Sequence, residues 1–418
     1  MNYKKLFPFY DNNPDAVYLD TACMGLKPRK VIDSICNYYT HYSTCAGRAI
    51  YRLSQDLSIK IDESRGAVAS LINASSKKEI IFTRNTSESI NILANIFPFN
   101  KRKRVIISEK EHNSNHCVWK ELEKRGKIKL TILDVNNDNT FNLELFENEM
   151  KKNDVALVSL VHISNLDGIE NPIKQISEIT HKYNSLIFID GAQSVPHTKV
   201  DVQALGIDFL AFSMHKVYGP TGIGILYIKN EHFKDLSLYN VGGDTIKNTY
   251  IKKETKYKSY PYKYEAGLQD YANILGCKAA CDFVNEIEYN KMEEGIDLLN
   301  REFREFLHKY EEIQIIGDCN ILSVKGITTF LIKKFTRFSE KDLSIGEILD
   351  RRHNIMLRTG FFCVNPYFDN RERKNLLNPI YYPPIRVSFG FYNDNKDLEV
   401  LKNGISEILE SIKDWPVI

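Results

Sequence analysis

A chain of 418 residues that is 43% hydrophobic and 26% charged has the composition of a globular protein. Lysine and arginine total 56 against 54 aspartates and glutamates, and a net charge of +2 gives no reason to expect a nucleic-acid or membrane partner. The start lacks the apolar core of a signal peptide and no apolar run reaches membrane-spanning length, so we expect a cytoplasmic protein. The length predicts two domains in close contact.

Apolar runs alternate with helical patterns through the middle of the chain. Seven runs predict buried strands: 79–83, 104–108, 128–133, 154–164, 185–190, 208–213 and 223–228. Segments with helical spacing lie between several of them, such as SESINILANIF and IKQISEITHKY. This alternation predicts an α/β fold in which a mainly parallel seven-stranded sheet is flanked by helices.

The pattern changes after about residue 280. A long charged helical stretch leads to a region with expected strands near 327–333, 354–358 and 385–390. An amphipathic helix over 396–415 closes the chain. We expect a large domain over 26–284 and a smaller α+β C-terminal domain over 285–418. Residues 1–25 are expected to form an N-terminal segment that packs with the small domain.

One segment, KNTYIKKETKYKSYPYK at 247–263, is rich in lysine and tyrosine. Basic residues among aromatics can hold single-stranded nucleic acid. A solvated hairpin or an arm that contacts a second subunit accounts for the same composition, and we favour that interpretation.

The eight cysteines form no CxxC pair and no zinc-ligand pattern, which predicts no metal site. Each is by default a reduced, packed thiol in a cytosolic chain.

Lys216 is in an unusual position, because it lies between two apolar strands, where an ammonium ion is costly to bury.

Polar groups follow the ends of several predicted strands: Asp190 and Gln193, Ser213 and His215, Thr86 and Ser87, His112, and Asn165. Ligands of open α/β sheets bind at the carboxyl edge, and hydroxyls at a helix N-terminus suit a phosphate. A lysine, a carboxylate, a phosphate seat and an imidazole together suit pyridoxal phosphate (PLP). The lysine amine would form a Schiff base and the carboxylate would pair with the pyridinium nitrogen.

The stretch DGAQSVPHTKVDVQALGIDFLAFSMHKVYGPTGIGILY resembles the signature of class V aminotransferase-fold PLP enzymes, in particular the cysteine desulfurase and selenocysteine lyase branch. The similarity extends over nearly the whole chain, through YLDTACMGLKP, EIIFTRNTSESINILA, SEKEHNSN, HISNLDGIENPI, IMLRTGFFCVNP and IRVSFGFYND. It implies PLP fold type I and a homodimer, since in this fold the active site lies at the subunit interface.

The resemblance also implies how the cofactor is held. Lys216 would form the Schiff base, and His112 would stack on the ring. Asp190 would pair with the pyridine nitrogen and Gln193 with the phenolic oxygen. Four side chains would hold the phosphate: Thr86, Ser87, Ser213 and His215.

By the same resemblance, Asn165 and Arg386 would receive the α-carboxylate of the substrate, which a planar guanidinium binds bidentately. Cys363 lies in a segment like the loop that carries the desulfurase nucleophile. Arg358 would favour its thiolate and assist substrate binding. The expected function is conversion of L-cysteine to L-alanine with a persulfide on Cys363, supplying a sulfur-acceptor protein, for example for iron–sulfur cluster assembly.

The chain departs from the family pattern in places. Phe361 and Phe362 stand where many relatives have two histidines, and Leu268 replaces a threonine that commonly reaches the partner's cofactor phosphate. Gln269 or a backbone N–H could donate to this phosphate in place of the threonine hydroxyl. The sequence of residues 364–384 predicts a long loop, which could act as a lid or as a docking surface for an acceptor protein. A basic loop at 45–54 offers Arg48 or Arg52 as weaker candidates for substrate contact.

Other functions stay open at this point. The enzyme could be a selenocysteine lyase, another C–S lyase, or a class V aminotransferase in which Cys363 is incidental. A different class is an RNA- or partner-binding protein that has lost catalysis and uses 247–263. The Asp190, Lys216 and His112 set argues against that class, since binding alone needs none of these groups.

Overall fold

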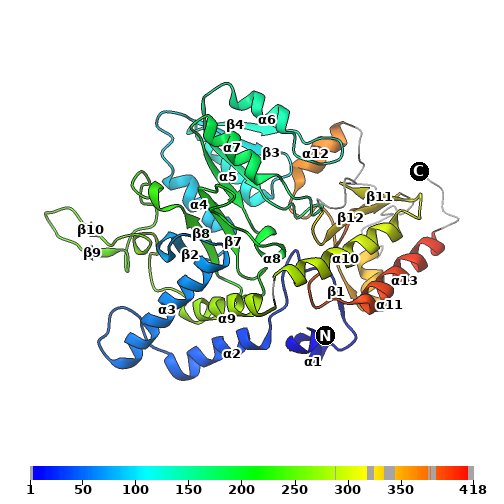
Figure 1. Ribbon diagram of the computed structural model, residues 1–418, viewed down its shortest axis with the longest axis horizontal. Helices are drawn as coiled ribbons and strands as arrows, with labels where there is room; N and C mark the ends of the chain where they lie inside the picture. The colour runs from blue at the N-terminus through cyan, green and yellow to red at the C-terminus, as the bar shows by residue number, and fades with distance from the viewer. Residues whose placement is uncertain are drawn as a thin grey trace.

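A seven-stranded sheet forms the centre of the molecule, with helices on both faces (Figure 1). The computed structural model describes residues 3–287, 289–317, 324–333, 344–374, 377 and 383–412. Within these ranges, no helix has both the length and the apolar composition to cross a membrane. The sheet has the order β2-β8-β7-β6-β5-β3-β4. Its strands in chain order are β2 (Ile80–Thr83), β3 (Arg104–Ser108), β4 (Lys129–Leu133), β5 (Val155–Val161), β6 (Leu186–Asp190), β7 (Phe209–Ser213) and β8 (Gly224–Ile228).

All seven predicted strands are confirmed, and the sheet is mainly parallel. The exception is β8, which runs antiparallel to both β7 and β2. The connection between β7 and β8 is too short for the crossover helix that a parallel return requires. This tight connection carries Lys216.

Apolar residues of the strands alternate between the two faces of the sheet. In β2, Ile80 packs into one hydrophobic cluster and Ile81 into the other. The Ile81 side is covered by α4 (Thr86–Ile96) and α5 (Asn113–Lys124). The Ile80 side receives α3 (Arg52–Leu71), α6 (Leu143–Met150), α7 (Ile173–Lys182) and α9 (Tyr271–Ile287). Further helices in this part of the chain are α1 (Phe9–Asn12), α2 (Arg29–Asn37) and α8 (Ser194–His197).

A second, antiparallel sheet follows the long helix α10 (Tyr289–Leu307). Its order is β11-β12-β15-β14, with β11 (Ile313–Ile316), β12 (Ile327–Ile332), β15 (Ile385–Ser388) and β14 (Arg358–Thr359). The strand expected near 354–358 is in fact two, because β13 (Ile355–Met356) leaves this sheet and pairs in parallel with β1 (Val17–Tyr18). This region also contains the helices α11 (Ile345–His353) and α13 (Asn395–Ser411).

The N-terminal segment therefore lies against the C-terminal region, through β1 and β13 (Figure 1). The exact division into domains stays a prediction. The segment at 247–263 contains the predicted hairpin, formed by β9 (Ile246–Asn248) and β10 (Lys256–Tyr257), which projects from the body of the molecule (Figure 1).

The expectation of a loop throughout 364–384 is wrong for its first part. Residues there form the helix α12 (Asn365–Arg373). A proline is tolerated in a first helical turn, so Pro366 does not prevent the helix. Tyr367 and Phe368 bury their rings in a cluster with Phe362, which stabilises it. Residues 375–376 and 378–382 lie outside the described residues.

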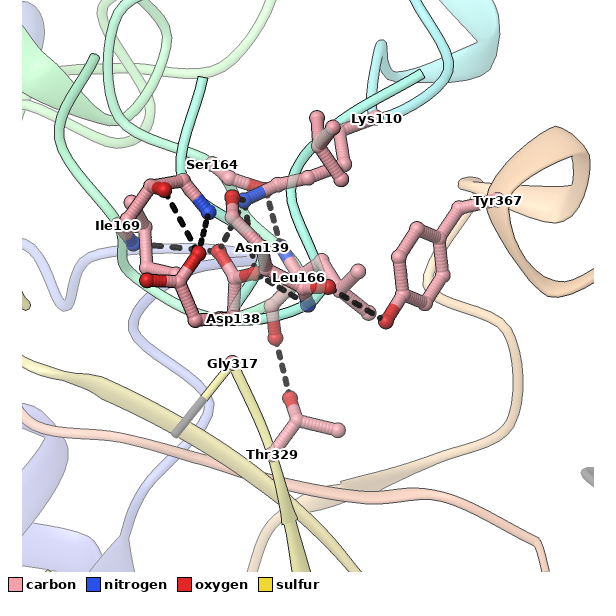
Figure 2. Close-up of polar contacts among 12 residues, drawn as sticks. Lys110, Asp138, Asn139, Ser164, Leu166, Ile169, Gly317, Thr329 and Tyr367 are labelled. Carbon is pink, nitrogen blue, oxygen red and sulfur yellow. Dashed lines mark hydrogen bonds and ion pairs between the residues drawn. The ribbon is translucent and has the colours of Figure 1, made fainter. Parts of the chain in front are cut away.

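A buried polar network joins the two sheets (Figure 2). Lys110 Nζ forms an ion pair with Asp167 Oδ2 at 2.8 Å and donates to the carbonyl of Asn139 at 2.9 Å. Tyr367 of α12 donates to Asn139 Oδ1 at 3.0 Å, and Thr329 of β12 donates to the carbonyl of Leu166. The loop after β5 is thus fixed to β12 and α12, which positions the neighbouring Asn165.

The network predicts the effect of Tyr367→Phe. Loss of the hydroxyl leaves Asn139 Oδ1 without this buried donor, so the free energy of unfolding should fall by about 1–2 kcal/mol. Urea denaturation measures the change. Tyr239→Phe is the control, since Tyr239 is half exposed and donates no hydrogen bond among the described residues. Equal stability of the two variants would contradict the prediction.

Candidate active site

A cavity of about 310 Å³ lies at the carboxyl ends of β5, β6 and β7. Residues from the N-terminal segment and from the C-terminal region close it. All twelve residues predicted for the site line this cavity: Thr86, Ser87, His112, Asn165, Asp190, Gln193, Ser213, His215, Lys216, Arg358, Cys363 and Arg386. The structure therefore brings together groups that are as much as 300 residues apart in the sequence.

Lys216 projects from the β7–β8 connection. Its Nζ has no hydrogen bond or ion pair with any described residue. Burial lowers the pKa of Lys216, and the nearby carboxylate of Asp190 opposes this shift. A larger share of neutral amine makes the lysine a better nucleophile. Gly25 packs against the Lys216 carbonyl so closely that a Cβ there would lie 2.9 Å from the oxygen.

Asp190 and Gln193 lie at and just after the end of β6. Asp190 accepts a hydrogen bond from the backbone N–H of Ala192 at 3.0 Å, and burial raises the pKa of its carboxyl group. Gln193 donates from Nε2 to the carbonyl of Ala22 at 2.7 Å. Its Oε1 is buried without a hydrogen-bond partner among the described residues. Both side chains keep polar atoms available at the cavity wall.

The N-terminus of α4 places hydroxyls at the cavity. Ser213 Oγ accepts from the backbone N–H of Thr86 at 2.8 Å and lies 2.6 Å from Thr86 Oγ1. Ser87 Oγ lies 2.6 Å from Ser114 Oγ, at the start of α5. Hydroxyls and free N–H groups at a helix N-terminus form a site for an anion such as a phosphate. Beside them, burial lowers the pKa of His215 to about 4.

His112 is the N-cap of α5. Its Nδ1 accepts from the backbone N–H of Ser114 at 3.1 Å, which leaves Nε2 as the protonated nitrogen of a neutral ring. Burial and the nearby Lys216 lower the pKa of His112 to about 4, so the ring is neutral at pH 7.

Arg386 on β15 faces the cavity from the C-terminal sheet. Its Nη2 donates to Asp20 Oδ1 at 2.9 Å and its Nη1 to the carbonyl of Asn165 at 3.1 Å. The guanidinium lies 4.9 Å from the ring centroid of Phe362. Its Nε is buried and has no partner among the described residues. Asn165 in turn donates to the carbonyl of Phe362 at 2.8 Å.

Cys363 sits in a strained turn between β14 and α12. Phe362 and Cys363 have φ of 49° and 59°, in the left-handed region that costs energy for residues other than glycine. The carbonyl of Phe362 accepts from Asn165, and that of Cys363 accepts from the backbone N–H of Asn113 at 2.7 Å. These bonds hold the turn so that the partly exposed thiol faces the cavity.

Arg358 contacts a residue that sequence reasoning missed. Its Nη1 donates to Cys23 Sγ at 2.9 Å, and Cys23 lines the same cavity. No spacing distinguishes this cysteine from the other seven, since the contact depends on tertiary packing.

The weaker candidates lie outside this cavity. Arg48 pairs with Asp244 at 2.6 Å, and neither Arg48 nor Arg52 lines the site. The side chain of Leu268 is 69% exposed. Gln269 donates to carbonyls of its own segment, on Ala266 and Gly267, so it does not replace the missing threonine within this chain.

Residues 17–401 match the family model for aminotransferase class-V. A probable cysteine desulfurase of Halalkalibacterium halodurans is 32% identical over 419 residues, covering 97% of each chain. A cysteine desulfurase of Escherichia coli O8 is 32% identical over 402 residues, covering 95% of this chain and 94% of the relative.

Two solved structures are similar along almost the entire chain. The cysteine desulfurase CsdA of Escherichia coli has a TM-score of 0.86 and 27% identity, with 98% of each chain covered. The apo structure of a cysteine desulfurase from Thermococcus onnurineus has a TM-score of 0.87 and 28% identity. The match covers 98% of this chain and 97% of that chain.

The fold and the cavity define an enzyme of PLP fold type I. The chain belongs to the class-V aminotransferase family, whose enzymes depend on PLP. The resemblance found in the sequence motifs is thereby confirmed.

Proposed function

We propose that the protein is a PLP-dependent cysteine desulfurase, which converts L-cysteine to L-alanine and leaves the sulfur on Cys363. The observation that carries this proposal is the placement of the Cys363 thiol in one cavity with Lys216 and Arg386. An aminotransferase needs the lysine and the arginine, but it has no use for a thiol presented at the substrate.

The donor set of the cavity fits PLP. Lys216 would bind the aldehyde carbon, Asp190 the pyridine nitrogen and Gln193 the phenolic oxygen. Thr86, Ser87, Ser213 and His215 would surround the phosphate, next to the N-terminus of α4. When bound, the cofactor supplies an electron sink for the α-carbon of the amino acid.

The remaining residues would bind and orient the substrate. Arg386 and Asn165 would hold the α-carboxylate, and Arg386 Nε is a buried donor available for it. His112, neutral at pH 7, would stack on the ring and carry a proton on Nε2. The Cys363 thiolate would attack the substrate sulfur. A sulfur–sulfur bond forms, the carbon–sulfur bond breaks, and alanine leaves once its β-carbon is protonated.

The test is an incubation of the purified, PLP-loaded protein with L-cysteine. We expect alanine to form and a sulfur atom to be added to the peptide that contains Cys363, as detected by mass spectrometry. A cofactor that reacts with amino acids but gives neither alanine nor persulfide would overturn the proposal and favour a class V aminotransferase or another lyase.

Arg386→Lys tests the carboxylate site. Lysine keeps the charge but loses the planar fork, so KM for L-cysteine should rise about 10- to 100-fold with a smaller change in kcat. Steady-state alanine formation measures both constants. The control is Arg125→Lys, which alters an exposed arginine at the C-terminal end of α5. An unchanged KM would contradict a role for Arg386 in substrate binding.

We also propose that the enzyme is a homodimer that passes sulfur to an acceptor protein. Support for the dimer comes from large apolar side chains that are exposed in this chain: Ile50 in the 45–54 loop is 90% exposed, and Ile251 in the hairpin is fully exposed. Contact with a second subunit would remove these apolar side chains from water, which is favourable. Light scattering on the purified protein distinguishes a dimer from a monomer.

A further inference from the structure

Cys23 is held firmly in the wall of the candidate active site. The Cys23 N–H donates to the carbonyl of Asp20 at 3.0 Å, which closes a turn. Both sides of that turn are anchored. Ala22 donates to Ser388 Oγ at 3.0 Å and accepts from Gln193 at 2.7 Å, and Gly25 donates to the carbonyl of His215 at 3.1 Å. The backbone around Cys23 is therefore fixed at the cavity by bonds to β15, to the residues that follow β6 and to the β7–β8 connection.

The surroundings of Cys23 suit a sulfur anion. Arg358 Nη1 lies 2.9 Å from its Sγ, a contact that complements the charge of a thiolate. The same cavity contains Lys216 and the almost completely buried Arg386, whose Nε has no partner among the described residues. Cys363 is the other thiol of the cavity. The remaining cysteines in the described part of the chain do not line it.

We propose that Cys23 is a second sulfur-carrying thiol of the active site, which takes the outer sulfur from the persulfide on Cys363. This inference rests on the proposed desulfurase function. In the transfer, the Cys23 thiolate attacks the outer sulfur of Cys363–S–SH. The bond between that sulfur and Cys363 breaks, its electron pair remains on Cys363 as a thiolate, and Cys23–S–SH forms. Atoms, charge and oxidation level balance without a further reactant.

Sulfur transfer to Cys23 has a consequence for stoichiometry. Once Cys363 is a free thiolate again, the subunit can process another L-cysteine before any acceptor arrives. We therefore expect an initial burst of about two molecules of alanine per subunit, against about one if Cys363 alone stores sulfur.

The experiment uses the PLP-loaded enzyme and a few equivalents of L-cysteine, with no acceptor or added reductant. The reaction is quenched with iodoacetamide after the burst, alanine is counted, and tryptic peptides are analysed by mass spectrometry. Residues 6–29 and 359–371 are separate tryptic peptides, each with one cysteine. We expect added sulfur on both peptides, and Cys23→Ser should halve the burst. Cys117→Ser, at an exposed cysteine of α5, is the matched control and should leave the burst unchanged.

The outcomes separate this inference from the proposed function. Alanine formation with sulfur on residues 359–371 alone overturns the role of Cys23 and leaves the desulfurase standing. A burst of about two alanines per subunit in Cys23→Ser, with two sulfurs on Cys363, also overturns the role of Cys23. Absence of alanine from an enzyme that retains its cofactor overturns both. The cofactor absorbance of each variant reports whether the site is still folded.

Discussion

Replacing Cys363 by serine is expected to lower the rate of alanine formation from L-cysteine by at least about 10³-fold, because the nucleophile for the substrate sulfur is lost. A serine hydroxyl is similar in size, but it is hardly ionised at neutral pH and reacts poorly with sulfur. The groups proposed to hold PLP, such as Asp190 and Thr86, keep their contacts. The variant should therefore retain its bound cofactor.

Two measurements check this expectation together. Alanine is quantified after incubation with L-cysteine, and the absorbance spectrum shows whether the cofactor remains. Lys216→Ala is the complementary variant, in which activity and the lysine-dependent absorbance should both disappear. A Cys363→Ser enzyme that forms alanine at the normal rate would show that Cys363 is an incidental thiol in the loop.

Glu265→Gln is expected to lower the free energy of unfolding by about 3–5 kcal/mol, because it leaves the Arg65 guanidinium buried without its counter-charge. Arg65 and Glu265 form a two-pronged pair with distances of 2.6 and 2.8 Å, and both side chains are at most 5% exposed. Glu265 also accepts from the backbone N–H of Phe82 at 2.8 Å, so it ties β2 to the segment before α9.

Urea denaturation of the purified variants measures this loss. The matched control is Glu121→Gln, which removes one partner of an exposed helical pair with Arg125 and should cost less than about 0.5 kcal/mol. The double variant Arg65→Met, Glu265→Leu should regain much of the stability, since no charge is then left buried. A cost for Glu265→Gln no larger than that of the control would show that the buried pair is not important for stability.

The strands, and the gathering of polar residues at one edge of the sheet, could be predicted because both depend on local sequence. A short apolar run ends in a polar residue, and the carboxyl ends of parallel strands meet at one edge, so Asp190 and Ser213 had to approach each other. The helix at 365–373 could not be predicted in this way, because the burial of Tyr367 and Phe368 outweighs the loop-like composition around them. Contacts such as Arg358 with Cys23 or Arg386 with Asp20 join residues more than 300 positions apart, and no local pattern encodes them.

The pairing of β1 with β13 also constrains the order of events during synthesis. Val17 lies beside Ile355, and Asp20 bridges to Ser388, so the first strand has no partner until most of the chain has left the ribosome. Contacts of such long sequence separation slow folding and leave the unpaired segment exposed meanwhile. The central sheet can form earlier, yet the wall that carries Cys23 and Arg386 closes only after β13 and β15 have been made. Newly made chains would therefore pass through a stage in which the cofactor cavity is not yet closed. In that stage oxidants could reach its thiols, and chaperones could bind the exposed segment.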